Sequence, residues 1–239
     1  MKHLSLSVLG ISALLIAAPL TVASAADMAV KAPPAPAAPM WNWTGTYVGV
    51  VGGGGWGRTN QVDLNGITTN PYNQSGGTFG GTAGIQVQNN KWVLGAETDL
   101  SWARINGTVA VPVCVGGTCF TNLKWFGTVR ARVGYAWDRW MIFGTGGVAY
   151  GSVNAGQDSC PTIPGNIAFC GTHTEVGWTA GAGIEGFIAP NWSVKLEYLY
   201  IDLGNHFSYT PVVPVNVTQE RVNLVRAGIN YHFNWVAAK

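Results

Sequence analysis

The chain has 239 residues, enough for one domain of moderate size or two small ones. Only 10% of the residues are charged and the formal net charge is +2, so we expect no nucleic-acid partner. Hydrophobic residues make up 47%, yet after residue 25 no apolar run reaches the ~18 residues that indicate a membrane-spanning helix. The 33 glycines and 11 tryptophans are unusually many for this length.

Residues 1–25 have the pattern of a secretory signal peptide. A lysine and a histidine precede an apolar stretch over residues 6–20, and Ala23-Ser24-Ala25 fits the small-x-small cleavage rule. An uncleaved membrane anchor is the alternative. Residues 26–42 follow as a lead-in rich in proline and alanine, which we expect to be extended, semi-rigid and periplasmic.

From there on, apolar and polar residues alternate in short segments. Trp192, Val194 and Leu196, for example, are separated by Ser193 and Lys195. Side chains of a strand point to opposite faces in turn, so each segment has one apolar and one polar face. Eight strands are predicted in this way, over residues 44–56, 77–88, 92–104, 123–137, 140–153, 174–188, 192–203 and 220–233.

The connections between the predicted strands alternate in length. Those after the second, fourth and sixth strands are tight: Asn89-Asn90-Lys91, Asp138-Arg139 and Ala189-Pro190-Asn191. The other four exceed a dozen residues and are rich in Gly, Asn, Thr and Pro. Bacterial outer-membrane barrels have an even number of strands, short periplasmic turns and long outer loops. The pattern therefore predicts an all-β fold, an eight-stranded antiparallel up-and-down transmembrane β-barrel over residues 43–235, with a tail at 236–239.

The faces of three strands can be assigned. In the fourth strand, Val129 and every second residue on either side of it face lipid. Arg130 and every second residue on either side of it, Lys124 included, face inward. The strands at 44–56 and 140–153 are rich in glycine and their faces stay open. Outward aromatic residues bracket the apolar segments, as in the interface girdles of membrane barrels. We predict this role for Trp92, Trp102, Trp125, Tyr135, Trp137, Trp140, Trp192, Tyr198, Tyr231 and Phe233.

The inward positions collect equal numbers of acids and bases. They are Glu97, Asp99, Glu185 and Glu197 with Arg130, Arg132, Lys195 and Arg226. One unpaired buried charge costs several kcal/mol, so these residues must pair in a narrow lumen. They could form a charged selectivity path or a plug. Eight strands leave a lumen that side chains just fill, which favours the plug.

Three segments in this order resemble the small outer-membrane β-barrel proteins of alphaproteobacteria, often called porin-like surface antigens. They are Trp43-Thr44-Gly45-Thr46-Tyr47-Val48-Gly49, Glu197-Tyr198-Leu199-Tyr200-Ile201-Asp202-Leu203-Gly204 and Arg226-Ala227-Gly228-Ile229-Asn230-Tyr231-His232-Phe233. The resemblance covers residues 41–233. It implies insertion by the outer-membrane assembly machinery, a place among outer-membrane lipid and lipopolysaccharide, an envelope-supporting role and no catalytic centre. Members end at the terminal aromatic, whereas Asn234 to Lys239 follow Phe233 here.

Four cysteines form two local pairs in long loops, Cys114 with Cys119 and Cys160 with Cys170. An even number in an exported chain predicts disulfides, although three connectivities are possible. A metal site that includes His173 is the alternative, but the spacing matches no zinc pattern. We therefore expect disulfide staples and no metal.

No catalytic or cofactor motif has its required context. Gly181-Ala182-Gly183-Ile184-Glu185-Gly186 matches GxGxxG but lies inside a strand pattern and opens no helix. His206 and His232 have no serine or cysteine nearby in a nucleophile arrangement. We expect no cofactor, and a structural and surface-interaction role. The alternatives are a narrow porin, an adhesin or ligand receptor acting through the loops, a soluble periplasmic β-protein and, last, an enzyme.

Overall fold

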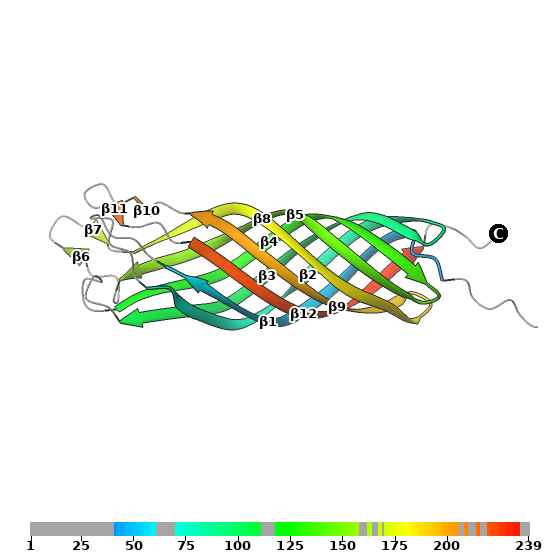
Figure 1. Cartoon of the computed structure of the whole chain (residues 1–239), viewed down its shortest axis with the longest axis horizontal. Helices are drawn as coiled ribbons and strands as arrows, with labels where there is room; N and C mark the ends of the chain where they lie inside the picture. Colours follow the sequence, from blue (N-terminus) through cyan, green and yellow to red (C-terminus); the bar gives the residue numbers. More distant parts are fainter. Residues whose placement is uncertain are drawn as a thin grey trace, which may run out of the picture. The chain divides into compact units, whose positions relative to one another are not determined.

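The computed structural model describes residues 41–60, 70–110, 118–157, 162–163, 167–168, 170–205, 208–209, 214–215 and 219–234. Every regular element in these ranges is a β-strand (Figure 1). No helix in this part of the chain is long and apolar enough to cross a membrane. The predicted signal peptide and most of the lead-in lie outside the described residues.

Eight long strands close into one antiparallel barrel, which confirms the predicted fold. Each strand pairs with its neighbours along the chain, and the last strand pairs with the first. The strands are β1 (Gly45–Thr59), β2 (Tyr72–Asn89), β3 (Trp92–Ala110), β4 (Thr118–Trp137), β5 (Trp140–Gln157), β8 (Cys170–Ala189), β9 (Trp192–Asn205) and β12 (Gln219–Asn234). Two short pairs complete the elements: β6 (Thr162–Ile163) with β7 (Ile167–Ala168), and β10 (Ser208–Tyr209) with β11 (Pro214–Val215).

The tight turns lie where the sequence predicted them. Asn90 and Asp138 adopt left-handed backbone conformations, with φ of 54° and 52°, which asparagine and aspartate tolerate well. Each turn is also bonded to the next hairpin: the Ala136, Phe187 and His232 amides donate to carbonyls of the three turns, at 2.7, 2.9 and 2.8 Å. These contacts hold the turn end of the barrel together. The short strands β6, β7, β10 and β11 lie at the opposite end, called the loop end here (Figure 1).

The strands are longer than a membrane requires. They contain 14 to 20 residues, whereas about 9–11 residues of tilted strand cross a bilayer. Along β12, outward residues are apolar or aromatic from Phe233 to Val225, and then become Asn223 and Arg221. The membrane-spanning part of β12 therefore ends near Val225, and the strand continues beyond the membrane on the loop side.

The polarity of the barrel reverses at this level. Within the membrane band the lumen side carries the charges, but beyond it the lumen side is apolar. Eleven buried apolar residues form that second core, which we call the loop-end core: Ala103, Ile105, Leu123, Phe126, Ala149, Val153, Leu199, Ile201, Leu203, Val222 and Leu224. The reversal has a simple cause: lipid surrounds the wall on the turn side of this level, whereas water surrounds the wall on the loop side.

The structure also settles faces that the sequence left open and corrects one that it assigned. In β1, Tyr47 and Val51 point inward, and in β5, Met141 and Phe143 do so. Lys124 was predicted to face inward, but it is exposed. The pairing register shifts between Leu123 and Trp125, so the irregularity turns Lys124 to the outside.

Candidate functional site

The eight predicted lumen charges come together in one buried network. None of them is more than 3% exposed. Burial to this extent is tolerated only when every charge has partners of the opposite sign. Each of the eight forms an ion pair with at least one residue of opposite charge.

The network spans the lumen from wall to wall. The Lys195 Nζ on β9 donates to Glu97 Oε2 on β3 at 2.9 Å, and these two strands lie opposite each other in the barrel order. Arg226 on β12 reaches across to Asp99 on β3, with Nη1 to Oδ1 at 2.9 Å. Lys195 also lies 3.5 Å from Glu197 on its own strand. In an open pore each wall has its own lining, whereas here the side chains of opposite walls contact each other.

Arg130 on β4 links three of the acids. It forms ion pairs with Glu97, its register partner on β3, with Asp99 at 3.1 Å and with Glu197 on β9 at 3.1 Å. Arg226 pairs with Glu197 as well, at 2.9 Å. The half of the network nearer the loop end therefore combines three acids, Glu97, Asp99 and Glu197, with three bases, Arg130, Lys195 and Arg226.

A second half lies nearer the turn end. Arg132 pairs with Glu185 on β8, and its Nη1 donates to the Tyr47 hydroxyl at 3.1 Å. Tyr47 in turn donates to Glu97 Oε2 at 2.6 Å, which connects the two halves. The guanidinium of Arg132 also lies 3.8 Å from the centre of the Phe143 ring, a cation–π contact.

Pairing on one face of the neighbouring strands β3 and β4 would join Glu97 and Asp99 to Arg130 and Arg132. Both acids contact Arg130, whereas Arg132 lies 3.6 Å from Glu97 and is paired mainly with Glu185. In the described part of the chain no ion pair joins Asp99 to Arg132. Thr128, the register partner of Asp99, donates to its carboxylate instead.

An aromatic cluster closes the turn end of the lumen. Trp43 is fully buried, with its ring centre 4.3 Å from that of Phe187, and Trp41 stacks on Phe187 at 5.2 Å. Met141 and Phe143 belong to the same cluster. Trp41, the last residue but one of the predicted lead-in, packs against this cluster, so the chain reaches the end of the lumen before β1 begins. Two tryptophans directly after a proline- and alanine-rich stretch were the available signal.

The loop end is closed in two layers. The loop-end core lies on the loop side of the charges, and a polar layer lies on the loop side of that core. There, Tyr72 is hydrogen-bonded to Thr121 at 2.7 Å, and the Gln74 amide donates to Glu220 at 2.7 Å. Glu220 is a fifth buried acid that the sequence analysis missed. It lies beyond the membrane-spanning part of β12, and burial raises the pKa of its carboxyl to about 7.

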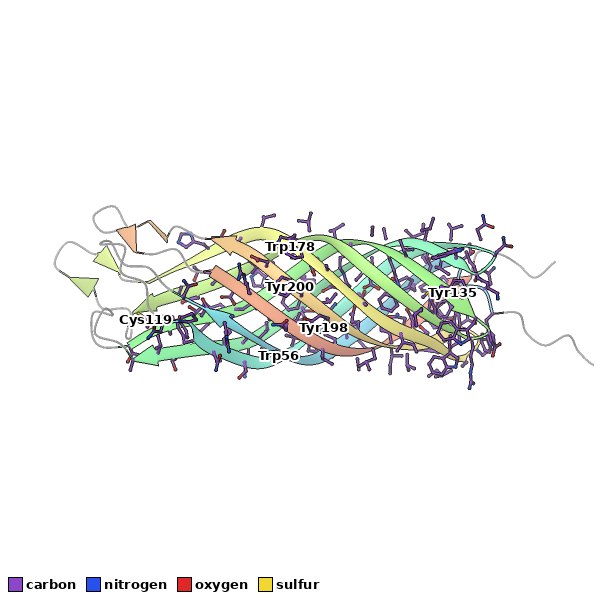
Figure 2. All side chains as sticks on the ribbon, in the orientation of Figure 1. Trp56, Cys119, Tyr135, Trp178, Tyr198 and Tyr200 are labelled. Carbon is purple, nitrogen blue, oxygen red and sulfur yellow. The ribbon has the colours of Figure 1, made fainter. Side chains whose placement is uncertain are left out.

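The predicted interface aromatics lie on the outer wall. Most are exposed, and Trp125, Trp140 and Tyr231 are half-buried. Trp92 and Tyr135 form an edge-to-face pair at 5.4 Å, and Trp192 and Tyr231 a second at 5.1 Å. Figure 2 shows Tyr135 near the turn end and Tyr198 nearer the loop end. Further rings that were not predicted lie toward the loop end, among them Trp56, Trp178 and Tyr200.

Residues 15–233 match the family described as outer membrane protein beta-barrel domain. The chain belongs to this family. It is 39% identical over 233 residues to the 31 kDa outer-membrane immunogenic protein of Brucella melitensis biotype 1, covering 89% of this chain and 94% of the relative. It is 32% identical to the 22 kDa outer membrane protein of Rhizobium leguminosarum bv. viciae, covering 70% and 68%. The predicted alphaproteobacterial outer-membrane family is confirmed.

A solved structure supports the fold. The outer membrane protein OprG from Pseudomonas aeruginosa superposes with a TM-score of 0.53 at 14% identity, covering 81% of this chain and 99% of that chain. At this identity the likeness concerns the fold alone. Together with the family and its relatives, it establishes this protein as an integral β-barrel of the outer membrane.

One cluster in this outer-membrane barrel has the residue types of a catalytic triad. Ser193 Oγ lies 2.8 Å from His232 Nε2, a contact over 39 residues that the sequence analysis did not foresee. Glu185 Oε1, however, accepts from Ser193 itself at 2.5 Å and lies 3.5 Å from the same Nε2. A triad needs its acid on the other ring nitrogen, so that Nε2 is left to take the serine proton. Ser193 is also fully buried.

The remaining sequence motifs have structural places. The GxGxxG segment lies inside β8 and opens no helix, so the context for dinucleotide binding is missing. Cys119 is disulfide-bonded, and no cysteine in the described residues is free. Cys114 and Cys160 lie outside the described residues, so the predicted pairings remain predictions. Among the residues that the structure describes, no three His, Cys, Asp or Glu side chains come together in a way that could hold a metal ion.

Proposed function

We propose that this protein is a non-conducting, non-catalytic structural barrel of the outer membrane that presents its long loops to the outside. The observation that carries the proposal is the cross-lumen charge network, held between an aromatic cluster at the turn end and the loop-end core. Eight strands give a lumen that side chains fill, and here they fill it in layers of different polarity. An ion or solute would have to displace the side chains of every layer to cross the lumen.

The narrow-porin alternative is less consistent with this geometry. A cation-selective or anion-selective path is lined by charges of one sign with mobile partners in water. Here four acids and four bases neutralise one another, and the contacts join opposite walls. An ion entering from the loop side would have to pass the polar layer and then the loop-end core, in which Leu199, Leu224 and Phe126 are fully buried.

The surface role is supported by topology and relatives. All four long connections follow the same end of the strands, and the strands continue past the membrane at that end. Loops placed on a rigid scaffold are the usual carriers of binding. Relatives from Brucella are named immunogenic proteins, which fits surface exposure of those proteins.

The proposal is tested in a strain that lacks the protein. We expect increased leakage of a periplasmic enzyme and increased uptake of a hydrophobic dye, restored by the wild-type gene. Uptake of small sugars and amino acids at limiting concentration should not change. Loss of small-solute uptake with an intact permeability barrier would instead establish the porin alternative.

A further inference from the structure

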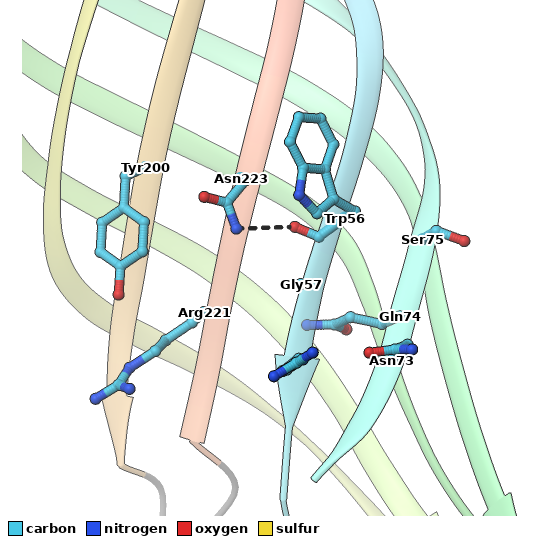
Figure 3. Close-up of a pocket in the computed structure, with 9 residues that line it drawn as sticks. Trp56, Gly57, Asn73, Gln74, Ser75, Tyr200, Arg221 and Asn223 are labelled. Carbon is cyan, nitrogen blue, oxygen red and sulfur yellow. Dashed lines mark hydrogen bonds between the residues drawn. The ribbon is translucent and has the colours of Figure 1, made fainter.

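A pocket of about 630 Å³ lies on the outer wall of the barrel, at the loop end of β9, β12, β1 and β2 (Figure 3). Its lining combines two cations, two aromatic rings and neutral hydrogen-bonding groups. The residues that matter are Trp56 and Arg58 of β1, Asn73 of β2, Tyr200 of β9, and Arg221 and Asn223 of β12. None of them takes part in the lumen network.

Two arginines on neighbouring strands line this pocket. Arg58 and Arg221 are register partners on β1 and β12, and both are exposed. Asp202 is the partner of Arg221 on its other side, and Asn73 is that of Arg58. Like charges directly opposite on one face of a sheet are destabilising. The two neighbouring cations therefore favour an anion bound at this row.

The pocket itself supplies only part of the neutralising charge. Arg221 donates from Nε to Asp202 Oδ2 at 3.2 Å, which leaves its two terminal nitrogens for another acceptor. In the part of the chain that the structure describes, no carboxylate forms an ion pair with Arg58. The planar guanidinium matches phosphate oxygens in a two-point contact, so a phosphate group satisfies this geometry well.

The depth of the pocket indicates which molecule carries the phosphate. Figure 3 shows Asn223 donating to the Trp56 carbonyl, a contact of 3.4 Å, one step nearer the turn end than the arginine row. Further toward the turn end the outer wall becomes apolar, with Val50 and Phe79 exposed. A ligand with acyl chains on that wall and an anionic head group on the loop side of the aromatic rings would contact both zones at once. Aromatic rings at the boundary fit such an amphipathic molecule.

We propose that this pocket binds a phosphate group of the phosphorylated glycolipid in the outer leaflet, the lipopolysaccharide of the outer membrane. A second basic pair supports a basic outer wall at this level. Arg104 and Lys124 are both exposed where β3 and β4 shift register, beside Trp102 and Trp125. The proposal rests on the outer-membrane location and is independent of whether the lumen conducts.

The test uses the full folded chain in neutral detergent micelles, titrated with phosphorylated lipid A and with the same lipid after phosphate removal. We expect the wild type to bind the phosphorylated lipid at least about tenfold more tightly, and R58Q/R221Q to lose this preference. K91Q/R139Q, which removes two exposed cations at the turn end, is the matched control and should keep it. Inorganic phosphate at the same concentration should not displace the lipid.

Folding of each variant is checked by the shift in electrophoretic mobility on heating. If the double variant does not fold, R58Q alone carries the test, because Arg58 contributes no ion pair in the described residues. Equal binding of the two lipids by the wild type would overturn the proposal, as would an unchanged preference in the arginine variant. Displacement by inorganic phosphate at equal concentration would overturn the assignment to the glycolipid.

Discussion

Lys195 and Glu97, 98 residues apart in sequence, form a hydrogen-bonded ion pair of 2.9 Å across the lumen. Their strands, β9 and β3, lie on opposite walls of the barrel. The pair thus fixes the two walls to each other, whereas the ladder fixes only neighbouring strands. It also occupies the centre of the lumen, where a water-filled channel would otherwise run.

This pair should be strongly coupled in stability. Lys195→Met leaves Glu97 and Glu197 short of one cation, and we expect a loss of about 3–5 kcal/mol in the free energy of unfolding. Glu97→Gln combined with Lys195→Met should cost less than the sum of the two single changes, by at least ~1 kcal/mol. Urea unfolding from lipid vesicles measures the cycle. Lys91→Met, at an exposed turn, is the control, and strictly additive effects would contradict the network.

Gly84 makes room for the tyrosine that connects the two halves of the network. A Cβ at this position would lie 2.4 Å from Tyr47 Cζ. Gly84→Ala should therefore displace the ring, weaken its bond to Glu97 and cost about 1–3 kcal/mol. Gly77→Ala is the control, since the nearest atom to its Cβ is 3.8 Å away. Equal stability of the two variants in urea unfolding would show that Tyr47 is not tightly held.

The depth of the membrane band gives a further expectation. Val129 is 54% exposed near the middle of the apolar wall of β4, so Val129→Arg should cost about 2–4 kcal/mol in vesicles. Asn106 of β3 is also exposed on the outer wall, but it lies on the loop side of the interface aromatics Trp102 and Trp125. Asn106→Arg should cost about 1 kcal/mol or less. Similar losses for both substitutions would place the membrane at a different height.

Glu220 should make stability depend on pH. Burial raises its pKa from 4.5 to about 7, so the folded state holds this proton more tightly than the unfolded state. Stability is therefore lost as the pH rises through the window between these two values. Glu220→Gln should be more stable than the wild type at pH 8, by up to about 3 kcal/mol, and similar to it near pH 4. Asp138→Asn, at an exposed turn, should follow the wild-type profile.

The sequence predicted the barrel because alternation and turn chemistry are local signals. Residues 192 to 198 show the alternation, and Asn90 and Asp138 are residue types that tight turns favour. Charged residues on the inward face of β3 and β4 could be assigned for the same reason. Only their cross-lumen partners, such as Lys195 for Glu97, depend on barrel closure and were beyond reach.

Other features were missed because their signal is not local. Leu199, Ile201 and Leu203 occupy inward positions of β9, as Lys195 and Glu197 do, but they are apolar, because the surroundings of the wall change from lipid to water. Lys124 turns outward at a register shift, which no alternating pattern shows. His232 meets Ser193 only because β12 and β9 are neighbours in the closed barrel.

The most direct test of the closed lumen is single-channel recording of the purified, folded protein in planar bilayers. We expect no resolvable conductance steps from the wild type across moderate voltages. Arg130→Gln with Arg132→Gln should increase leak, since it removes two side chains that fill the lumen. Folding is verified by heat-dependent mobility before each recording. Stable, ohmic and reproducible steps from folded wild-type protein would contradict a closed lumen and establish a narrow pore.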